Sequence, residues 1–385
     1  MKKSLFIVLM AIGVLSSCTQ SEDELFEDSN NSVMLEELGN SHALTAEQAT
    51  ENALAFLKEY HGINTRSFSA MNVENVVACK ASDVIGDATR AALVNDGIAF
   101  YAINLKDEKG FILAAADDRY EPIYAYIETG HYENVDSTAG GFKWFIDVLA
   151  QRAVDSNDSV LLKKTNITTR GLSTIVGPYL TTKWGINSPY NMHTYSSTCT
   201  SQGVALAQIA SYYECPDSVS YSLSNSLTIG CAINWGAIMA VSNYQNGKLV
   251  LEDSIASQVS HLIRYIEGVY PTETFWGTYY ALQQMANAGF HAGEPYTIYA
   301  FNSDSDVRSY LDDEELIYAR GSVTPASGTI GQVSGKAWVI DGYNGNKFHC
   351  NWGLDGNFDG YFFSSGFSPY PGVTYNYQLA YQPIY

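Results

Sequence analysis

The feature that most limits how this chain can fold is a run of three strand signals close to its C-terminus. Residues 336–343, 346–352 and 358–363 are rich in aromatic residues, and glycine- and asparagine-rich turns separate them. The stretch DGYNGNK at 341–347 is typical of a tight hairpin turn, which joins neighbouring antiparallel strands. A helix signal that begins after Ser201 precedes these strands. One leading helix followed by a twisted antiparallel sheet predicts an α+β fold.

The first half of the chain carries a second set of helix and strand signals. In TAEQATENALAFLKEYHG at 45–62, Thr45 and Gln48 have the spacing of a capping box, and apolar residues recur at helical intervals. Strand signals follow at 98–105, 110–116 and 121–130, and a further helix signal lies at 140–153. The first two strand signals flank the charged turn KDEK and predict a hairpin. Together these signals predict a small α+β domain.

A length of 385 residues is sufficient for two domains of ordinary size, each with a buried core. We expect a signal peptide, an acidic tether, an N-terminal domain, a linker and a C-terminal domain, at residues 1–18, 19–44, 45–160, 161–172 and 173–385 respectively. The C-terminal domain has two more helix signals, near 252–267 and 276–287. The linker contains Lys163, Lys164 and Arg170, which we expect to be accessible to a trypsin-like enzyme.

The N-terminus has the features of a bacterial lipoprotein signal. Lys2 and Lys3 precede an apolar run at 5–15, which is too short to span a bilayer. The sequence LSSC, which ends at Cys18, resembles a lipobox, so we expect Cys18 to be lipidated and to hold the chain at a membrane. The acidic SEDE at 21–24 resembles surface-export signals of some Gram-negative lipoproteins. These features predict an outer-membrane lipoprotein at the cell surface, and the alternative is a plain secretory signal.

The composition restricts the possible partners and cofactors. The formal net charge of −20 argues against nucleic acid and against direct binding to an anionic membrane surface, because phosphate groups would be repelled. Besides Cys18 the chain has five cysteines, without CxxC spacing, at Cys79, Cys199, Cys215, Cys231 and Cys350. This number and spacing predict neither a disulfide framework nor a zinc site. Since no glycine-rich phosphate loop occurs either, the sequence implies no metal and no other cofactor.

Four motifs in the second half of the chain occur in a specific order. They are KWGINSPYN, VALAQIASYYECP, INWGAIM and GKAWVIDGYNGNKFHCNWG, at 183–191, 204–216, 233–239 and 335–353. In this order and spacing they resemble the streptopain family of papain-like cysteine peptidases. The stretch GFILAAADDRYEPIYAY at 110–126 resembles the inhibitory propeptide of that family. The two resemblances cover roughly residues 45–380 and imply a papain-like peptidase fold preceded by a propeptide-like domain.

The chemistry that the resemblance implies needs four groups. A thiolate at a helix N-terminus is stabilised by the helix dipole and by a neighbouring imidazolium. A side-chain amide and a backbone N–H hold the oxyanion, and a third group orients the imidazole. In the family the cysteine lies seven residues before the glutamine of an AQI sequence, and counting back from Gln208 leads to Ser201. Cys199 lies two residues too early for this position.

The other family positions are partly changed. Lys336 stands in the position of the histidine, and Ile186 stands in the position of the oxyanion glutamine. Asn351 and Trp352 are retained, although the usual NWGWGG of the family reads NWGLDG here. Because the nucleophile, base and oxyanion positions are all substituted, the resemblance predicts a peptidase homologue that has lost thiol chemistry.

The function expected from this pattern is binding of a peptide or protein in the former cleft, where a tyrosine-rich, acidic rim suits protein or glycan contact. Two alternatives remain open. One is a secreted endopeptidase that acts through an acyl-enzyme, with Ser201 as nucleophile and Lys336 as base, or with Cys199 activated by His193 or His349. The other is an inhibitor of a related cysteine peptidase that acts through the N-terminal domain.

Two further expectations concern single sites. Ser201 is a favourable helix N-cap residue, which would explain it without catalysis. The stretch YPTETFWGTYY at 270–280 is the densest aromatic segment, and we expect an exposed patch on a loop there. Its aromatic residues are Tyr270, Phe275, Trp276, Tyr279 and Tyr280.

Overall fold

The computed structural model describes most of the chain from residue 42 onward. The described residues are 42–61, 73–84, 97–134, 140–154, 175–223, 227–240, 244–245, 248–249, 254–291, 299–300, 304–322, 335–363 and 378–385. The predicted signal peptide with Cys18, the tether up to residue 41 and the predicted linker at 161–172 lie outside this set. Within the described ranges, no helix has the length and apolar character needed to cross a membrane.

The N-terminal domain combines four strands with two long helices. Its elements are α1 (Ala46–Tyr60), β1 (Val73–Lys80), α2 (Ala81–Val84), β2 (Ile98–Leu105), the 3₁₀ turn η2 (Lys106–Glu108), β3 (Phe111–Ala115), β4 (Ile123–Ile127) and α4 (Gly140–Val154). Thr45 caps α1, and its backbone N–H donates to Gln48 Oε1 at 2.9 Å, which completes the predicted capping box. β2 and β3 pair antiparallel around the KDEK turn. The predicted helix and hairpin are therefore confirmed.

The two helices lie on opposite faces of this sheet, which explains why its inner strands are buried at nearly every position. Along β2, Tyr101 and Ile103 pack in the same cluster as α1, whereas Phe100 and Ala102 pack in the same cluster as α4. Successive side chains of a strand point to opposite faces, so a sheet covered on both faces buries every one of them. β3 and β4 are buried throughout for the same reason.

The C-terminal domain places a group of helices beside strands of a long sheet. Its longer elements are α5 (Ser201–Tyr212), α7 (Ser254–Glu267), α8 (Phe275–Asn287), α9 (Asp304–Asp312), β11 (Leu316–Ser322), β12 (Lys336–Asn344), β13 (Lys347–Asn351), β14 (Gly360–Phe363) and β15 (Gln378–Ile384). Its shorter elements are β5 (Ile175–Val176), β6 (Ser218–Ser222), β7 (Thr228–Ala232), α6 (Trp235–Ile238), β8 (Tyr244–Gln245), β9 (Lys248–Leu249) and β10 (Tyr299–Ala300). The three C-terminal strand signals correspond to β12, β13 and β14, and Asn344 pairs with Lys347 across the predicted hairpin turn.

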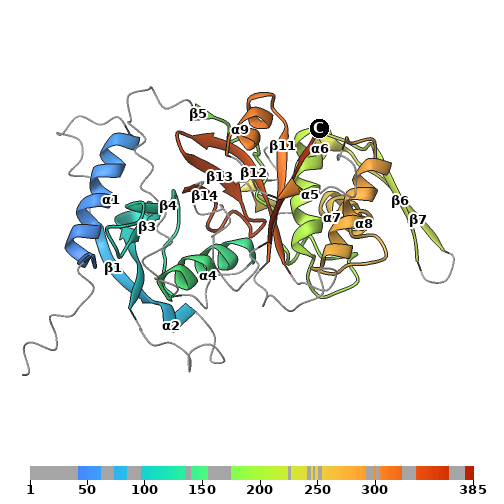
Figure 1. The fold of residues 1–385 in the computed structure, drawn as a ribbon. Helices are drawn as coiled ribbons and strands as arrows, with labels where there is room; N and C mark the ends of the chain where they lie inside the picture. The colour runs from blue at the N-terminus through green and yellow to red at the C-terminus, as the bar shows by residue number, and fades with distance from the viewer. Residues whose placement is uncertain are drawn as a thin grey trace, which may run out of the picture. The chain divides into compact units, whose positions relative to one another are not determined.

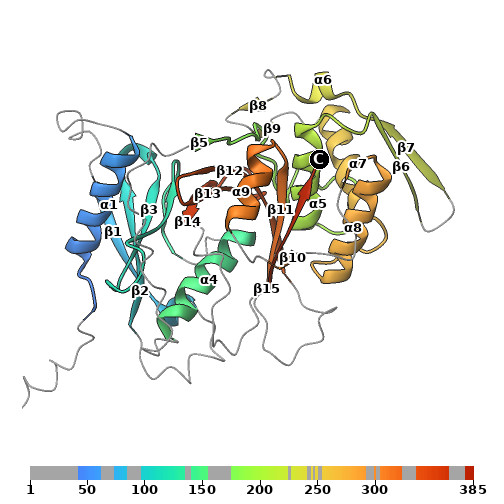
Figure 2. The same cartoon turned by 45° about the horizontal axis from the view of Figure 1, so that its top comes forward.

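One sheet runs through both domains. In the described residues its order is β1-β2-β3-β4-β14-β13-β12-β11-β15-β10, and β5 pairs with β12. The junction between the domains is the antiparallel pairing of β4 with β14, in which Tyr126 lies opposite Tyr361 (Figures 1 and 2). The antiparallel sheet and the helices confirm the predicted α+β class. The sheet also joins the two domains by main-chain hydrogen bonds.

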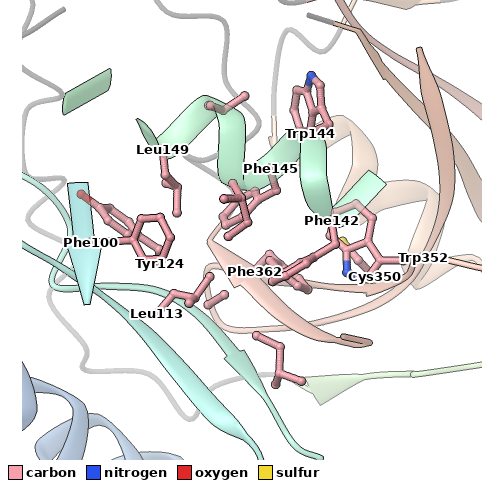
Figure 3. Packing of buried hydrophobic residues seen from close by; sticks show 14 of the residues in the cluster. Phe100, Leu113, Tyr124, Phe142, Trp144, Phe145, Leu149, Cys350, Trp352 and Phe362 are labelled. Carbon is pink, nitrogen blue, oxygen red and sulfur yellow. The ribbon is translucent and has the colours of Figure 1, made fainter. Parts of the chain in front are cut away.

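Helix α4 of the N-terminal domain packs on the strands of the N-terminal domain and also on strands that belong to the C-terminal domain. Trp144 stacks on Trp338 of β12, with ring centroids 5.2 Å apart. Phe142 and Phe145 lie edge-on to Phe362 of β14 (Figure 3). The largest hydrophobic cluster thus contains residues from both domains.

Helix α5 is the central helix of the C-terminal domain. Every residue from Ser201 to Ser211 is buried. The helix contacts α7 and α8 on one side and β11 and β12 on the other. A helix that is small or apolar on all faces is expected at such a place. Its N-terminus, where Ser201 lies, meets the start of β12 and the segment between α7 and α8.

Candidate active site

The start of α5 differs from the sequence-based expectation by one residue. Thr200 is the N-cap: its hydroxyl accepts a hydrogen bond from Gly203 N at 3.0 Å. Ser201 is the first residue of the helix itself. The prediction that Ser201 caps α5 is therefore wrong, and its hydroxyl is available for other contacts.

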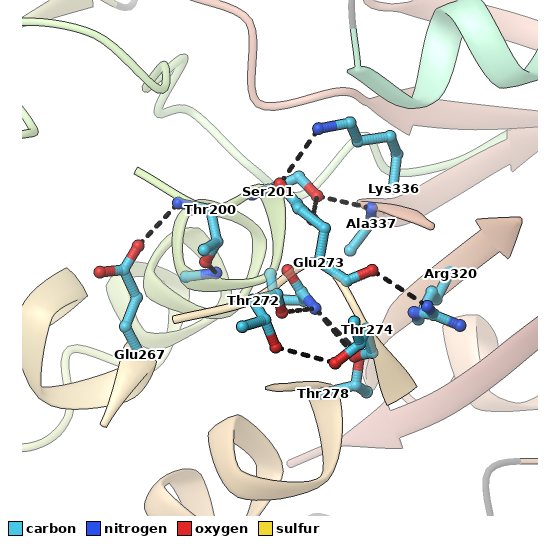
Figure 4. A network of polar contacts seen from close by, with 12 residues as sticks. Thr200, Ser201, Glu267, Thr272, Glu273, Thr274, Thr278, Arg320, Lys336 and Ala337 are labelled. Carbon is cyan, nitrogen blue, oxygen red and sulfur yellow. Dashed lines mark hydrogen bonds and ion pairs between the residues drawn. The ribbon is translucent and has the colours of Figure 1, made fainter. Parts of the chain in front are cut away.

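The hydroxyl of Ser201 is held by a carboxylate. Ser201 is 5% exposed, and its Oγ donates to Glu273 Oε2 at 2.6 Å and accepts from Ala337 N at 2.9 Å. The backbone N–H of Ser201 donates to the other oxygen of the same carboxylate, Glu273 Oε1, at 2.8 Å (Figure 4). The residue in the nucleophile position is thus fixed by three hydrogen bonds.

Lys336, in the position of the family histidine, binds the same carboxylate. Its Nζ lies 3.2 Å from Glu273 Oε1, and its side chain is 42% exposed. The structure therefore brings the predicted Ser201/Lys336 pair to one place, but Glu273 lies between the two groups as their shared acceptor. A general base needs a free electron pair directed at the nucleophile, whereas this lysine nitrogen donates to a carboxylate.

Glu273 is a site residue that the sequence did not reveal. Its backbone oxygen accepts from Gly335 N at 2.7 Å and from Arg320 Nη2 at 3.2 Å. Arg320 is buried on β11. Glu273 thus links the α7–α8 segment with α5, β11 and β12. No spacing rule relates it to Ser201, because 72 positions separate the two residues in sequence. Its local sequence, a glutamate between two threonines ahead of a helix, is also common in turns and does not indicate a functional site.

A second carboxylate lies at the same helix end. Glu267 Oε1 accepts from Thr200 N at 2.6 Å, and the residue is 3% exposed. Burial raises the pKa of Glu267 to about 7, although the hydrogen bond from Thr200 opposes the shift. Two carboxylates therefore use the free N–H groups at the start of α5, which attract negative charge.

Ile186, in the oxyanion position, is partly buried and packs against the hydrophobic cluster around α5. Its backbone oxygen accepts from Cys199 N at 2.8 Å. A hydrocarbon side chain cannot donate a hydrogen bond to an oxyanion, and loss of one such donor typically costs about 100- to 1000-fold in rate. This position offers no catalytic help from its side chain.

Cys199, the alternative nucleophile, is buried and is joined by no hydrogen bond to the histidines proposed as its base. The residue is 4% exposed, and burial, with a contribution from Glu267, raises the pKa of its thiol well above the usual range. His193 Nε2 pairs with Ser257 Oγ at 2.8 Å. His349 Nδ1 pairs with Asp341 Oδ1 at 2.6 Å, and this carboxylate raises the pKa of His349 although burial opposes it. These contacts do not support a Cys199-based mechanism.

The two retained family residues are buried in structural contacts. Asn351 Oδ1 accepts from Gln208 Nε2 at 2.8 Å, and Asn351 Nδ2 donates to the backbone oxygen of Thr182 at 3.0 Å. Trp352 is 1% exposed, and its backbone N–H donates to Asp359 Oδ1 at 2.9 Å. Asn351 is thus directed at α5 and not at Lys336.

The aromatic segment near the site is partly exposed. Tyr270 is 48% and Trp276 is 52% exposed, while Tyr279 and Tyr280 are half-buried. Tyr270 stacks on Tyr280 with ring centroids 4.4 Å apart. The expectation of a loop is wrong from residue 275 onward, because Thr274 caps α8 there. The side chain of Phe275 is not among the described side chains.

In the described part of the chain no group of three or more His, Cys, Asp or Glu residues is arranged to hold a metal ion.

Comparison with known proteins agrees with this architecture. Residues 184–362 match the Peptidase C10 family, and residues 41–153 match the Spi protease inhibitor family. A fragment of prointerpain A from Prevotella intermedia is similar at 22% identity with a TM-score of 0.50, over 73% of this chain and 94% of that chain. Interpain A, the wild-type cysteine protease from the same organism, is similar at 22% identity with a TM-score of 0.36, over 55% of this chain and 94% of that chain. No curated protein matches.

The similarity to prointerpain A concerns the fold. The two family matches each cover a different part of the chain. The Peptidase C10 match begins at Trp184 and ends at Phe362, so it includes α5, Ser201, Glu273 and Lys336. The inhibitor match spans α1 to α4. The C-terminal domain therefore belongs to the peptidase C10, or streptopain, family, and the N-terminal domain is of the Spi inhibitor type.

Proposed function

We propose that this protein is a lipid-anchored peptidase C10 homologue of the bacterial cell surface that does not hydrolyse peptides and instead binds a polypeptide. The observation that carries the proposal is the shared carboxylate of Glu273, which holds both Ser201 Oγ and Lys336 Nζ. Lys336 donates to this carboxylate instead of accepting from Ser201, so the Ser201/Lys336 dyad is not formed, and Ile186 supplies no side-chain donor for an oxyanion.

The binding role rests on the surface next to this centre. Tyr270 and Trp276 are about half-exposed and lie on the same segment as Glu273. Half-exposed aromatic side chains supply contact area at low entropic cost and are enriched in protein interfaces. A relative of peptidases would meet polypeptides at this place, so a protein or peptide is the ligand class we propose.

Inhibition of a separate peptidase is less well supported, because the N-terminal domain already uses its contact surfaces within the chain. β4 is paired with β14, and Trp144 of α4 is stacked on Trp338. A domain engaged in this way would have to give up buried apolar contacts before it could bind another molecule.

The test uses the full chain and casein as the probe. We expect immobilised, unfolded casein to retain the wild-type protein and to be recovered intact. Tyr270→Ala/Trp276→Ala should weaken retention by about tenfold, as expected for loss of central aromatic contacts. Leu227→Ala is the matched control, since Leu227, which directly precedes β7, is also about half-exposed, at 57%, and should have no effect. Casein cleavage that disappears with Ser201→Ala would instead establish the serine endopeptidase.

The proposed lipid anchor has its own test. Lipidation of Cys18 would place the protein at the outer membrane. Stable anchoring needs two lipid signals, and acyl chains attached to Cys18 would supply both at one residue. Metabolic labelling with a palmitate analogue should mark the wild-type protein, and Cys18→Ala should abolish the label. A labelled Cys18→Ala variant, or an unlabelled wild type, would contradict the anchor.

A further inference from the structure

The carboxylate of Glu273 occupies a place that is built to hold an anion. It receives hydrogen bonds from the backbone N–H and the hydroxyl of Ser201, and it forms an ion pair with Lys336. The N-terminus of α5, a helix of twelve residues, adds the positive end of its dipole. Backbone N–H, hydroxyl, ammonium and helix dipole thus converge on one carboxylate that belongs to the protein itself (Figure 4).

A nucleophilic anion at residue 201 would need this same set of groups. A thiolate at a helix N-terminus is stabilised by the helix dipole and by an adjacent cation. With Glu273 present, the cation is already paired, and a second negative charge would lie within hydrogen-bond distance of the carboxylate. Like charges this close disfavour ionisation of the second group by several pKa units when they are shielded from water.

We propose that Glu273 is an internal occupant that closes the reaction centre, and that it is a fourth disarming position beside residues 201, 336 and 186. The inference rests on the proposed loss of peptidase activity and extends it. Restoring a thiol at residue 201 is then insufficient, because the carboxylate remains and suppresses the thiolate.

The backbone of Glu273 fixes the carboxylate in this place. Its carbonyl oxygen accepts from Gly335 N at 2.7 Å and from Arg320 Nη2 at 3.2 Å. Thr274, the next residue, caps α8 through Gly277 N. The residue is therefore anchored through its own carbonyl and through Thr274, and its side chain is directed at Ser201.

The test compares the thiol introduced by Ser201→Cys with and without the carboxylate. In Ser201→Cys the thiol should react slowly with iodoacetamide at neutral pH. In Ser201→Cys/Glu273→Gln the negative charge is lost while the shape is kept, and alkylation at residue 201 at neutral pH should become at least about tenfold faster, which corresponds to a fall of one pKa unit. Peptide mass spectrometry separates this residue from Cys199.

Two further measurements keep the outcome decisive. Glu214→Gln in the Ser201→Cys background makes the same charge change at the exposed C-terminal end of α5, and it should leave the rate unchanged. The ¹³Cβ shift of the introduced cysteine, titrated with pH, reports its pKa independently of reagent access. Equal pKa values with and without Glu273 would overturn the inference. Because the readout is thiol ionisation and not hydrolysis, the result stands apart from whether the wild-type chain proves active.

Discussion

At the scale of single residues, charge at the start of α5 decides what the centre can do. Glu267 and Glu273 both accept from backbone N–H groups there, at Thr200 and Ser201. The family resemblance located residues 201, 336 and 186 in the sequence, and the structure brings residues 201 and 336 together. Glu273 was not predictable, because its role depends on a tertiary contact that no local pattern encodes.

We predict that Glu267 makes the protein less stable as pH rises from the acidic range to neutral. Burial raises its pKa from 4.5 to about 7 in the folded state, so the folded state binds a proton more tightly than the unfolded state. Stability is then lost between about pH 4.5 and pH 7, by up to roughly 3 kcal/mol. Glu267→Gln should remove this part of the slope in urea unfolding measured across that range. Burial also raises the pKa of Asp359 to about 7, so part of the pH dependence of stability comes from that residue and should remain in Glu267→Gln. A slope that does not change at all in Glu267→Gln would contradict the raised pKa of Glu267.

We also predict an asymmetry between the partners of the Glu273 ion pair. Glu273→Ala removes the acceptor of the Ser201 N–H and hydroxyl and the negative charge near the buried Arg320, and it should cost roughly 2 kcal/mol. Lys336→Met should cost less than about 1 kcal/mol, because Lys336 is 42% exposed and solvent screens its charge. Urea unfolding of both single variants and the double variant measures the coupling. Equal costs for the two single variants would contradict this asymmetry. They would show that the ion pair with Lys336 contributes more to stability than the hydrogen bond from the Ser201 N–H to the carboxylate.

At the scale of elements, local patterns were sufficient where the stabilising contacts are local. The capping box of α1 and the β12–β13 hairpin follow from residues that are neighbours in sequence. The N-cap of α5 was misplaced at Ser201, because Thr200 and Ser201 are both good capping residues and only the geometry shows which hydroxyl accepts from Gly203 N. The packing of α4 on β12 joins residues far apart in the chain and gave no local signal.

This packing can be tested with glycine substitutions. A Cβ on Gly141 of α4 would overlap the rings of Trp352 and Trp338, which are rigid and buried. Gly141→Ala should therefore lower stability by about 1–3 kcal/mol, although alanine favours a helix. Gly236→Ala, in α6, is the control: its Cβ would meet only Asn234 Oδ1, at 3.6 Å, so it should be neutral or stabilising. A neutral Gly141→Ala would mean that α4 does not pack closely on this sheet.

At the scale of the whole described fold, the two domains share one sheet and one hydrophobic cluster. Lys347 of β13 lies over the ring of Phe56 in α1, 4.7 Å from its centroid, which adds a cation–π contact to the β4–β14 pairing. The sequence predicted two domains, each with its own core. It did not reveal that Trp338, Trp352 and Phe362 are covered by α4, because pairing partners and packing faces are set by the tertiary fold.

We predict that the C-terminal domain at 173–385 is not stable when expressed alone. Without α4 and β4, the buried rings of Trp338 and Phe362 would lose their cover, and the edge of β14 would be left unpaired. The full chain should unfold in one cooperative thermal transition, whereas the fragment should aggregate or unfold without a sharp transition. A fragment that melts cooperatively at the temperature of the full chain would contradict this prediction.

The central claim is that the hydroxyl of Ser201 is held by Glu273 and is not a nucleophile. The most direct measurement is the reaction of the full-length wild-type protein with a fluorophosphonate, followed by intact-mass spectrometry and peptide mapping, with a known serine hydrolase as positive control. The account predicts no adduct at Ser201. An adduct that forms on the wild type and disappears with Ser201→Ala would contradict it and would identify the protein as an active serine hydrolase on a cysteine-peptidase fold.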